Sequence, residues 1–318
     1  MPTILAADIG GTNSRFGWFE ARSGSEPRLL ESCAVPTAAV GSLAELFTRL
    51  RDEGFGLRPE DADRIVLAVA GPVRDGRVSR LTNASWGVDP ADPANHLPPG
   101  KTLLVNDFVA QALGCTLESA KVSAVTVQDG PVRPGVVAAV GPGTGLGLCA
   151  LVPLPGGGVL PLPSEGGHAP LAMIDRHEFA FLEFLQARTG HSHAFGDLVV
   201  SGPGLSLVHC FLTGRDLPPA AAAAEIGPDS ETAVWFARFL GRSCRSYALC
   251  VLAWGGVNLC GGVAVRNPFL ADHHEFRREF RDSPAYGEML GAIPVRLVTG
   301  SDTGLCGAAK YGAMALGS

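Results

Sequence analysis

The stretch "LAADIGGTNSRFGWF", residues 5–19, runs from apolar residues into a carboxylate, turns on two glycines and continues in a second apolar run. Apolar segments on both sides of Gly10 and Gly11 predict a strand, a tight turn and a second strand. Glycines let backbone N–H groups approach an anion closely, and the hydroxyl of Thr12 adds a donor beside the Asp8 carboxylate. This turn is therefore a candidate phosphate-binding element.

The same pattern returns in "GVVAAVGPGTGLGLCALVPL", residues 135–154, where Thr144 follows Thr12 by 132 positions. One such hairpin alone is better explained as a structural turn, but two matching hairpins in one chain favour phosphate-binding turns and an internal duplication. The second turn does not fit G-x-x-x-x-G-K-[ST], because no lysine follows. It does not fit G-x-G-x-x-G either, because Leu146 occupies the last glycine position. Both of those motifs lead into a helix, whereas this turn leads into a strand.

Length and composition indicate a two-domain globular protein that acts on small molecules. A chain of 318 residues exceeds what one hydrophobic core usually serves, so we expect two domains with a cleft between them. Hydrophobic residues make up 46% and charged residues 18%, which excludes a disordered chain. A net charge of −6 without clustered Lys and Arg argues against nucleic-acid binding. The absence of a basic segment before a long apolar run predicts a cytoplasmic protein.

Two other features need an interpretation. Residues 247–265 carry no charge and are long enough for a membrane span, but Gly255, Gly256, Gly261 and Gly262 divide them. We therefore expect a buried helix end followed by a buried strand and no membrane partner. The eight cysteines form no C-x-x-C pair and mostly have apolar neighbours, which favours buried thiols over a metal site.

Further strands are expected at 63–73 and 101–108, and helices at 42–54 and after Ser230, an N-cap residue. Strands that alternate with helices indicate an α/β layer structure.

Asp107 follows the apolar strand in "KTLLVNDF" and is a candidate general base. Phosphoryl transfer from a nucleotide requires phosphate donors, Mg²⁺ and a residue that accepts the proton of the attacking hydroxyl. A carboxylate at the carboxyl end of a strand can supply the last, and neighbouring Asn106 can orient a hydroxyl with its donor and acceptor atoms. The alternative for both residues is a turn or the N-cap of a helix that starts at "DFVAQALG".

The segment "PSEGGHAPL", residues 163–171, places Glu165 and His168 around a glycine pair. A carboxylate and an imidazole at such a bend can bind sugar hydroxyls, which need acceptors and donors together. Alternatively, His168 caps a turn or binds a metal, although no second ligand stands at a suitable spacing.

Taken in order, these residues resemble the bacterial glucokinase family, within the hexokinase, actin and Hsp70 ATPase superfamily. The resemblance covers nearly the whole chain and rests on "DIGGTNSR", "TNASW", "NDF", "GPGTGLG", "SEGGH", "SGPGL", "LCGGV" and "GSDTGLCGAA". Each motif is weak alone, but their order is specific. The resemblance implies a two-domain α/β, ribonuclease-H-like (actin-like ATPase) fold with a central cleft. It divides the chain into a small domain (1–115 plus 303–318) and a large domain (116–302), with the C-terminal helix returning to the small domain.

The resemblance also implies the activity: ATP-dependent phosphorylation of D-glucose to glucose 6-phosphate, the entry step of glycolysis, by a homodimer that uses Mg²⁺. It assigns Asp107 as the general base and Asn106, Glu165 and His168 as sugar contacts. Asp8 would sit near the metal ion, through water, and ATP would lie between the two hairpins. The residues implied to bind the nucleotide are Asp8, Gly10, Gly11, Thr12, Asn13, Gly143, Thr144, Gly145, Gly261 and Gly262.

One position departs from the family pattern, because Asp197 stands where the family has a further sugar-binding glutamate. Aspartate keeps the charge but is one methylene shorter, so a direct sugar contact becomes water-mediated or shifts. This leaves a kinase for another hexose as one alternative. A second is a non-catalytic sugar or nucleotide sensor or an assembly ATPase, neither of which needs Asn106, Glu165 and His168 as a set.

Overall fold

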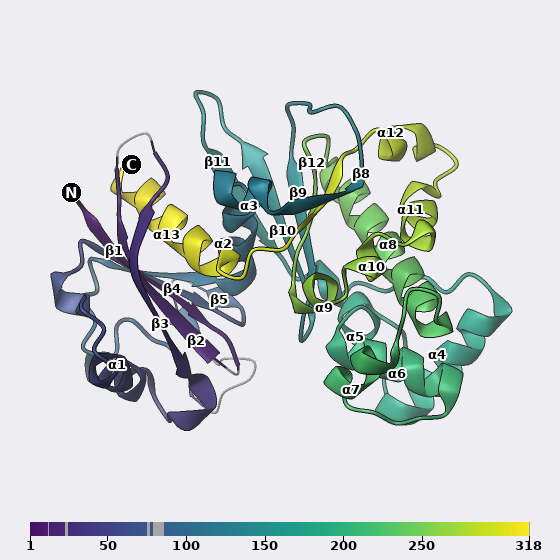
Figure 1. The fold of residues 1–318 in the computed structure, drawn as a ribbon, viewed down its shortest axis with the longest axis horizontal. Coiled ribbons are helices and arrows are strands. Elements are labelled where there is room, and N and C mark those ends of the chain that lie inside the picture. The colour runs from purple at the N-terminus through teal and green to yellow at the C-terminus, as the bar shows by residue number, and fades with distance from the viewer. Residues whose placement is uncertain (12, 23–24, 75–76, 79–85, 318) are drawn as a thin grey trace. The chain divides into compact units, whose positions relative to one another are not determined.

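The computed structural model describes residues 1–11, 13–22, 25–74, 77–78 and 86–317. The chain divides into two compact units, each with its own sheet (Figure 1). The first unit comprises Met1–Val122 and Gly300–Ser318, and the second comprises Ser123–Thr299.

The first unit is built on a five-stranded sheet of order β3-β2-β1-β4-β7. Its strands are β1 (Thr3–Ile9), β2 (Asn13–Glu20), β3 (Arg28–Pro36), β4 (Arg64–Val69) and β7 (Thr102–Asn106). β1, β2 and β3 are antiparallel neighbours, so the predicted first hairpin is confirmed. β1, β4 and β7 run parallel, in a register that aligns Ile9 with Val69 and Val69 with Asn106. The carboxyl ends of these three strands therefore meet at one edge of the sheet.

The second unit repeats this order in a six-stranded sheet, β11-β10-β9-β12-β13-β8. Its strands are β8 (Ala124–Gln128), β9 (Val137–Pro142), β10 (Leu146–Pro153), β11 (Val159–Ser164), β12 (Gly256–Leu259) and β13 (Val295–Val298). β9, β10 and β11 are antiparallel, whereas β9, β12 and β13 are parallel. Because the first five strands match the other sheet in order and direction, the duplication inferred from the two hairpins holds at the level of the fold.

Helices and short elements complete each unit. Those of the first are η1 (Thr37–Ala39), α1 (Leu43–Asp52), η2 (Pro59–Asp61), β5 (Val73–Arg74), β6 (Arg77–Val78), η3 (Pro93–Asn95), α2 (Asp107–Gly114), α3 (Glu118–Val122) and α13 (Thr303–Leu316). Those of the second are η4 (Gly166–His168), α4 (Arg176–Thr189), α5 (Gly196–Val199), α6 (Gly202–Thr213), α7 (Pro219–Glu225), α8 (Glu231–Val251), α9 (Gly262–Arg266), α10 (Pro268–Ala271), α11 (His274–Arg281) and α12 (Gly287–Gly291).

Local side-chain chemistry accounts for the start of both predicted helices. The hydroxyl of Ser42 accepts a hydrogen bond from the Glu45 N–H and begins α1, and Ser230 caps α8 through the Ala233 N–H. The uncharged stretch 247–265 contains the end of α8, then β12 and the start of α9. Among the described residues, no helix is long and apolar enough to span a bilayer.

The expectation of buried cysteines is correct for five of the eight and wrong for Cys250. Cys250 is exposed on the last turn of α8, whereas Cys33 and Cys306 are half-buried. The buried cysteines are Cys115, Cys149, Cys210, Cys244 and Cys260. No group of three His, Cys, Asp or Glu residues in the described part of the chain is arranged to hold a metal ion.

Each unit has its own apolar core. In the first, Leu5, Ile9 and Phe16 of the sheet pack against Leu43 and Leu46 of α1. In the second, aromatic side chains of α4, α6 and α8 pack together, with Phe181 in ring contact with Phe211, Trp235 and Phe239. The long helix α8 thus anchors the helical layer of the second unit.

The C-terminal helix α13 closes the first unit by packing on α2 and on strands β1 and β4 (Figure 1). Its contact with α2 leaves no room for side chains at two glycines. A Cβ at Gly307 would lie under 3.0 Å from the Ala110 carbonyl oxygen, and one at Gly114 equally close to the Thr303 carbonyl oxygen. The two helices therefore meet backbone to backbone, which fixes the position of α2 and of Asp107 at its start.

We expect Gly307→Ala to destabilise the chain by about 1–3 kcal/mol, because the clashing atoms belong to the backbone and cannot rotate away. Alanine is the better helix former by about 1 kcal/mol, so helix propensity alone would give the opposite sign. Urea unfolding followed by circular dichroism measures the change. Gly291→Ala is the matched helical control, since a Cβ there meets nothing within 4 Å. Equal unfolding midpoints for the two variants would contradict the backbone contact.

Candidate active site

The turn between β1 and β2 presents the first set of predicted site residues. The N–H of Gly10 donates to the Asn13 carbonyl oxygen at 3.2 Å and closes the turn. Gly10 and Gly11 are half-buried and Asn13 is exposed, whereas Thr12 lies outside the described residues. The turn begins directly after the carboxyl end of β1. Its first residue, Gly10, follows Ile9, which pairs with Val69 of β4.

Asp8 lies just before this turn, against the first turn of α13. A Cβ at Gly304 would lie 2.9 Å from Asp8 Oδ2 and 3.1 Å from Gln111 Oε1, so both oxygens border the same small space. The start of a helix carries partial positive charge, which favours a nearby carboxylate. Sequence reasoning missed Gln111. Its position one turn after Asp107 on α2 is the signal that could have found it.

Arg15, the cross-strand partner of Asp8, joins this group to the residues before α13. Its Nη1 donates to the Ser301 carbonyl oxygen at 2.5 Å and lies 3.9 Å from Asp302 Oδ1. Burial raises the pKa of Asp8 above its usual value; Arg15 opposes this shift, and the nearby Asp302 adds to it. Ionisation of Asp8 therefore lowers the stability of the folded state.

Asn106 and Asp107 stand where β7 passes into α2. The Oδ1 of Asn106 accepts from the N–H groups of Phe108 and Val109, at 2.9 and 3.3 Å, and its Nδ2 donates to the Gly71 carbonyl oxygen at 3.1 Å. Asn106 is therefore the N-cap of α2, the alternative considered from the sequence, and keeps only one N–H for another partner. Asp107 is the first residue of α2 and is half-buried.

Register places Asp8 and Asp107 at the same edge of the first sheet. Ile9, Val69 and Asn106 are aligned across β1, β4 and β7. Asp8 is the residue before Ile9, and Asp107 is the residue after Asn106. The structure thus brings the two carboxylates that were predicted separately to one side of the unit, near the glycine turn.

The turn between β9 and β10 is the counterpart in the second unit. The Gly143 N–H donates to the Gly145 carbonyl oxygen at 2.7 Å, and the Gly143 carbonyl oxygen accepts from the Gly202 N–H at 2.8 Å. Thr144 between the glycines is exposed. Helix α6 begins at this point, capped by Ser201, whose hydroxyl accepts from Gly204 at 3.1 Å. The capping role of Ser201 was not predicted, although Ser followed by Gly-Pro is a helix-start signal.

Gly261 and Gly262 lie at the same edge of the second sheet. Gly261 follows β12 with φ +87°, a conformation that favours glycine, and a Cβ there would lie 2.7 Å from the Pro142 carbonyl oxygen. Because β9 and β12 are parallel neighbours, Gly143 and Gly261 both follow carboxyl strand ends. A Cβ at Gly262 would lie 2.9 Å from the guanidinium of Arg266.

The loop after β11 carries Glu165, directly before the short helix η4, and His168, the last residue of η4; both are exposed. The His168 N–H donates to the Glu165 carbonyl oxygen at 3.0 Å. The His168 ring lies 5.7 Å from the ring of Phe195, centroid to centroid. The two polar side chains are thus presented by a turn whose backbone is hydrogen-bonded.

Asp197, on the short helix α5, contacts the second glycine turn. Its Oδ1 accepts from the Leu146 N–H at 2.5 Å, and a Cβ at Gly145 would lie 2.7 Å from its Oδ2. Asp197 is half-buried. The structure therefore brings this predicted sugar contact against the predicted phosphate turn.

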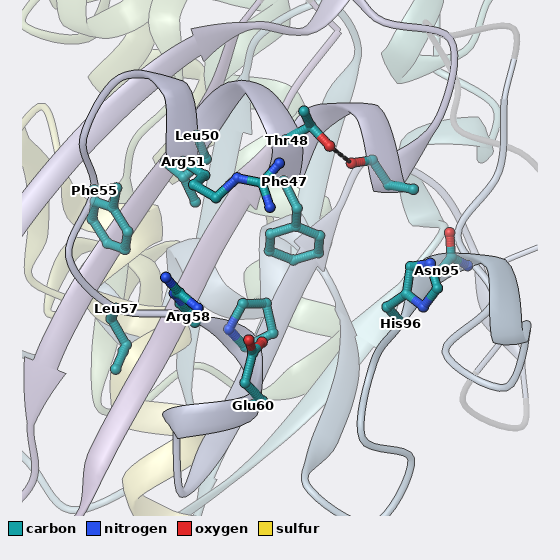
Figure 2. A pocket seen from close by; sticks show the side chains of 12 residues that line it. Phe47, Thr48, Leu50, Arg51, Phe55, Leu57, Arg58, Glu60, Asn95 and His96 are labelled. Carbon is teal, nitrogen blue, oxygen red and sulfur yellow. Dashed lines mark hydrogen bonds between the residues drawn. The ribbon is translucent and has the colours of Figure 1, made fainter.

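A pocket of about 250 Å³ in the first unit lies apart from these residues (Figure 2). Apolar side chains of Phe47, Leu50, Phe55 and Leu57 line it together with charged residues such as Arg51. None of the site residues predicted from the sequence lines this pocket. Its volume is also below the ~300–1,000 Å³ of most ligand sites.

Comparison with known proteins identifies relatives over nearly the whole chain. The family model described as Glucokinase matches residues 5–315. The glucokinase of Sinorhizobium medicae is 32% identical over an alignment of 320 residues, gaps included, and the alignment covers 97% of this chain and 91% of that protein. The crystal structure of a glucokinase from an Antarctic psychrotroph is 29% identical, with a TM-score of 0.80 and 100% of both chains covered. A glucokinase from Balamuthia mandrillaris, solved in complex with glucose, is 22% identical. Its TM-score is 0.79, with 98% of this chain and 94% of that chain covered.

Replacing Asp8 with Asn, which has the same shape without the charge, is expected to stabilise the chain at neutral pH. Burial raises the pKa of Asp8, so ionisation costs the folded state more than the unfolded one. The expected gain in unfolding free energy at pH 7 is on the order of 0.5–2 kcal/mol. It disappears at acid pH, where Asp8 is protonated in both states.

Urea unfolding of Asp8→Asn at pH 7 and near pH 3 measures both effects. Asp52→Asn, at an exposed position of α1, is the control and should leave stability nearly unchanged at both pH values. A loss of stability for Asp8→Asn at pH 7 would show that the Asp8 charge is favourably paired.

Proposed function

Because the chain belongs to the glucokinase family, we propose that Asp107 is the general base of an ATP-dependent phosphorylation of D-glucose. ATP is the phosphoryl donor and glucose is the acceptor. Asp107 takes the proton of the 6-hydroxyl as the bond between O6 and the γ-phosphorus forms. The bond from that phosphorus to the bridging oxygen of ADP breaks, and the products are glucose 6-phosphate and ADP.

The observation that carries this proposal is the position of Asp107 at the carboxyl end of β7. Asn106 fixes the backbone there by capping α2 and by its bond to the Gly71 carbonyl oxygen. The same helix is held against α13 by two close backbone contacts. Gly114 of α2 lies against Thr303 of α13, and Gly307 of α13 lies against Ala110 of α2. A base placed on two packed elements is oriented before the substrate arrives, which is the main contribution that a kinase makes to phosphoryl transfer.

We propose that ATP takes its phosphate contacts from the two glycine turns. The first supplies Gly10, Gly11, Thr12 and Asn13, and the second supplies Gly143, Thr144 and Gly145. Support comes from the placement of both turns at carboxyl strand ends and from the start of α6 beside Gly143. Gly261 and Gly262 let the backbone approach the adenosine.

Asp8 is the residue we propose to hold Mg²⁺, through a water molecule. The ion prefers hard oxygen ligands and is usually bound by one or two carboxylates together with substrate phosphates and waters. The half-buried Asp8 carboxylate, with Gln111 Oε1 beside the same small space, fits that donor set. When bound, the ion neutralises charge on the phosphates.

For the sugar we propose contacts from Glu165, His168, Asp197 and the remaining N–H of Asn106. The exposure of Glu165 and His168 on a hydrogen-bonded turn supports their role, since both are accessible to a ligand. We also propose the homodimer that the family resemblance implies.

Asp107→Ala is expected to lower kcat by about 10²–10⁴, the usual contribution of general-base catalysis. ADP production from Mg-ATP and glucose measures it, and Asp52→Ala, which removes an exposed carboxylate of the same unit, is the control. A kcat within about tenfold of the parent would remove Asp107 from the base role. Isothermal titration with glucose establishes that Asp107→Ala still binds the sugar.

The choice of hexose is tested separately, because Asp197 is shorter than the glutamate of the family pattern. We expect kcat/KM to be highest for glucose in a panel with mannose, fructose and glucosamine. A preference of tenfold or more for another sugar would change the substrate but not the reaction.

A further inference from the structure

We propose that Asp197 is a positioning residue that holds the β9–β10 turn to the sugar loop, defined as Glu165 to His168. This inference rests on the proposed function, because it concerns the phosphate and sugar contacts assigned above. It assigns Asp197 a task within the second unit that is present before any sugar binds.

The first observation is the contact of the Asp197 carboxylate with the turn. Its Oδ1 accepts from the Leu146 N–H at 2.5 Å. A Cβ at Gly145 would lie 2.7 Å from Oδ2 and still closer to Oδ1, so the carboxylate occupies the space that a side chain would fill. Hydrogen bonds from a backbone N–H to an ionised carboxylate are stronger than bonds between neutral groups. Asp197 therefore restrains the residue that ends the phosphate turn.

The second observation is that the sugar loop lies against the same place. A Cβ at Gly167, within the loop, would lie under 3.0 Å from the Leu146 carbonyl oxygen and 3.4 Å from Asp197 Oδ1. One at Gly196, beside Asp197, would lie 3.0 Å from the Gly167 carbonyl oxygen. Three chain segments thus meet backbone to backbone, and the Asp197 carboxylate lies where they meet.

The chain after the sugar loop is also tied to the segment that carries Asp197. The Leu171 N–H donates to the Ala194 carbonyl oxygen at 2.9 Å, and Pro170 and Phe195 form an isolated antiparallel bridge. The Gly196 N–H donates to the Ala169 carbonyl oxygen at 3.4 Å. A displacement of Asp197 would therefore move both the phosphate turn and the residues that follow His168.

The two roles considered for Asp197, a sugar ligand only or a support of the β9–β10 turn, lead to different experimental results. Loss of a sugar ligand lowers glucose affinity and leaves nucleotide binding without sugar unchanged. Loss of the brace weakens nucleotide binding even when no sugar is present, because the turn must then be ordered at the expense of binding energy. The length of the side chain matters as well, since an added methylene moves the carboxylate away from the position at which Oδ1 accepts the Leu146 N–H beside Gly145.

The experiment compares Asp197→Asn, Asp197→Ala and Asp197→Glu in the full chain. Isothermal titration with Mg and a non-hydrolysable ATP analogue, without sugar, gives the nucleotide Kd. We expect Ala and Glu to weaken binding by about tenfold, whereas Asn keeps Oδ1 as acceptor and stays within about threefold of the parent. Glu183→Ala, which removes an exposed carboxylate of α4, is the control.

Hydrogen exchange by mass spectrometry gives a readout that needs neither ligand nor activity. Peptides that span 141–148 should exchange faster in Asp197→Ala and Asp197→Glu than in the parent and in Asp197→Asn. Unchanged exchange together with an unchanged nucleotide Kd would overturn the proposal, even when glucose binding falls. If the parent chain itself fails to phosphorylate glucose, the proposed function fails instead, and the exchange result still decides the role of Asp197.

Discussion

The parallel pairing of the middle strands in each sheet is the constraint on which the site depends. In the first unit β1, β4 and β7 share a register that aligns Ile9, Val69 and Asn106. Each antiparallel hairpin turns at the same edge at which its parallel neighbours end. The topology thus places a glycine turn and the carboxylate proposed as the general base at the same edge of the sheet. The second unit uses the same rule for Gly143 and Gly261.

Close backbone packing converts this arrangement into fixed positions. Gly114 and Gly307 let α2 and α13 touch, and Gly304 leaves room for Asp8 and Gln111 beside the first turn of α13. The same packing desolvates Asp8 and raises its pKa, so ionisation of this carboxylate lowers stability at the position where we propose that it holds Mg²⁺. In the second unit, the Asp197 carboxylate occupies the space that a side chain of residue 145 would need, and the Leu146 backbone occupies that of residue 167. Glycine is required at both positions for this reason. Glycines in this chain thus serve close approach as much as turns.

The parts of the fold that depend on local pattern were predictable from the sequence. Both hairpins, the helix at 42–54 and the cap at Ser230 follow from apolar runs and from residues with short polar side chains, whereas the order of strands in each sheet does not. Asn106 shows where this reasoning reaches its limit, because the same amide suits a ligand contact and a helix cap, and only the structure shows it capping α2. The bond from Asp197 to Leu146 joins positions 51 residues apart, which no local pattern encodes. The exposure of Cys250 on α8 likewise depends on which helix face is covered.

Phosphorus-31 NMR of the purified chain, incubated with Mg-ATP and D-glucose, tests the central claim most directly. The account predicts that a sugar phosphate ester forms at the same rate as ADP. With 6-deoxyglucose, which lacks the hydroxyl that Asp107 would deprotonate, it predicts that no ester forms. Release of ADP and inorganic phosphate at the same rate with either sugar, or with none, would contradict it.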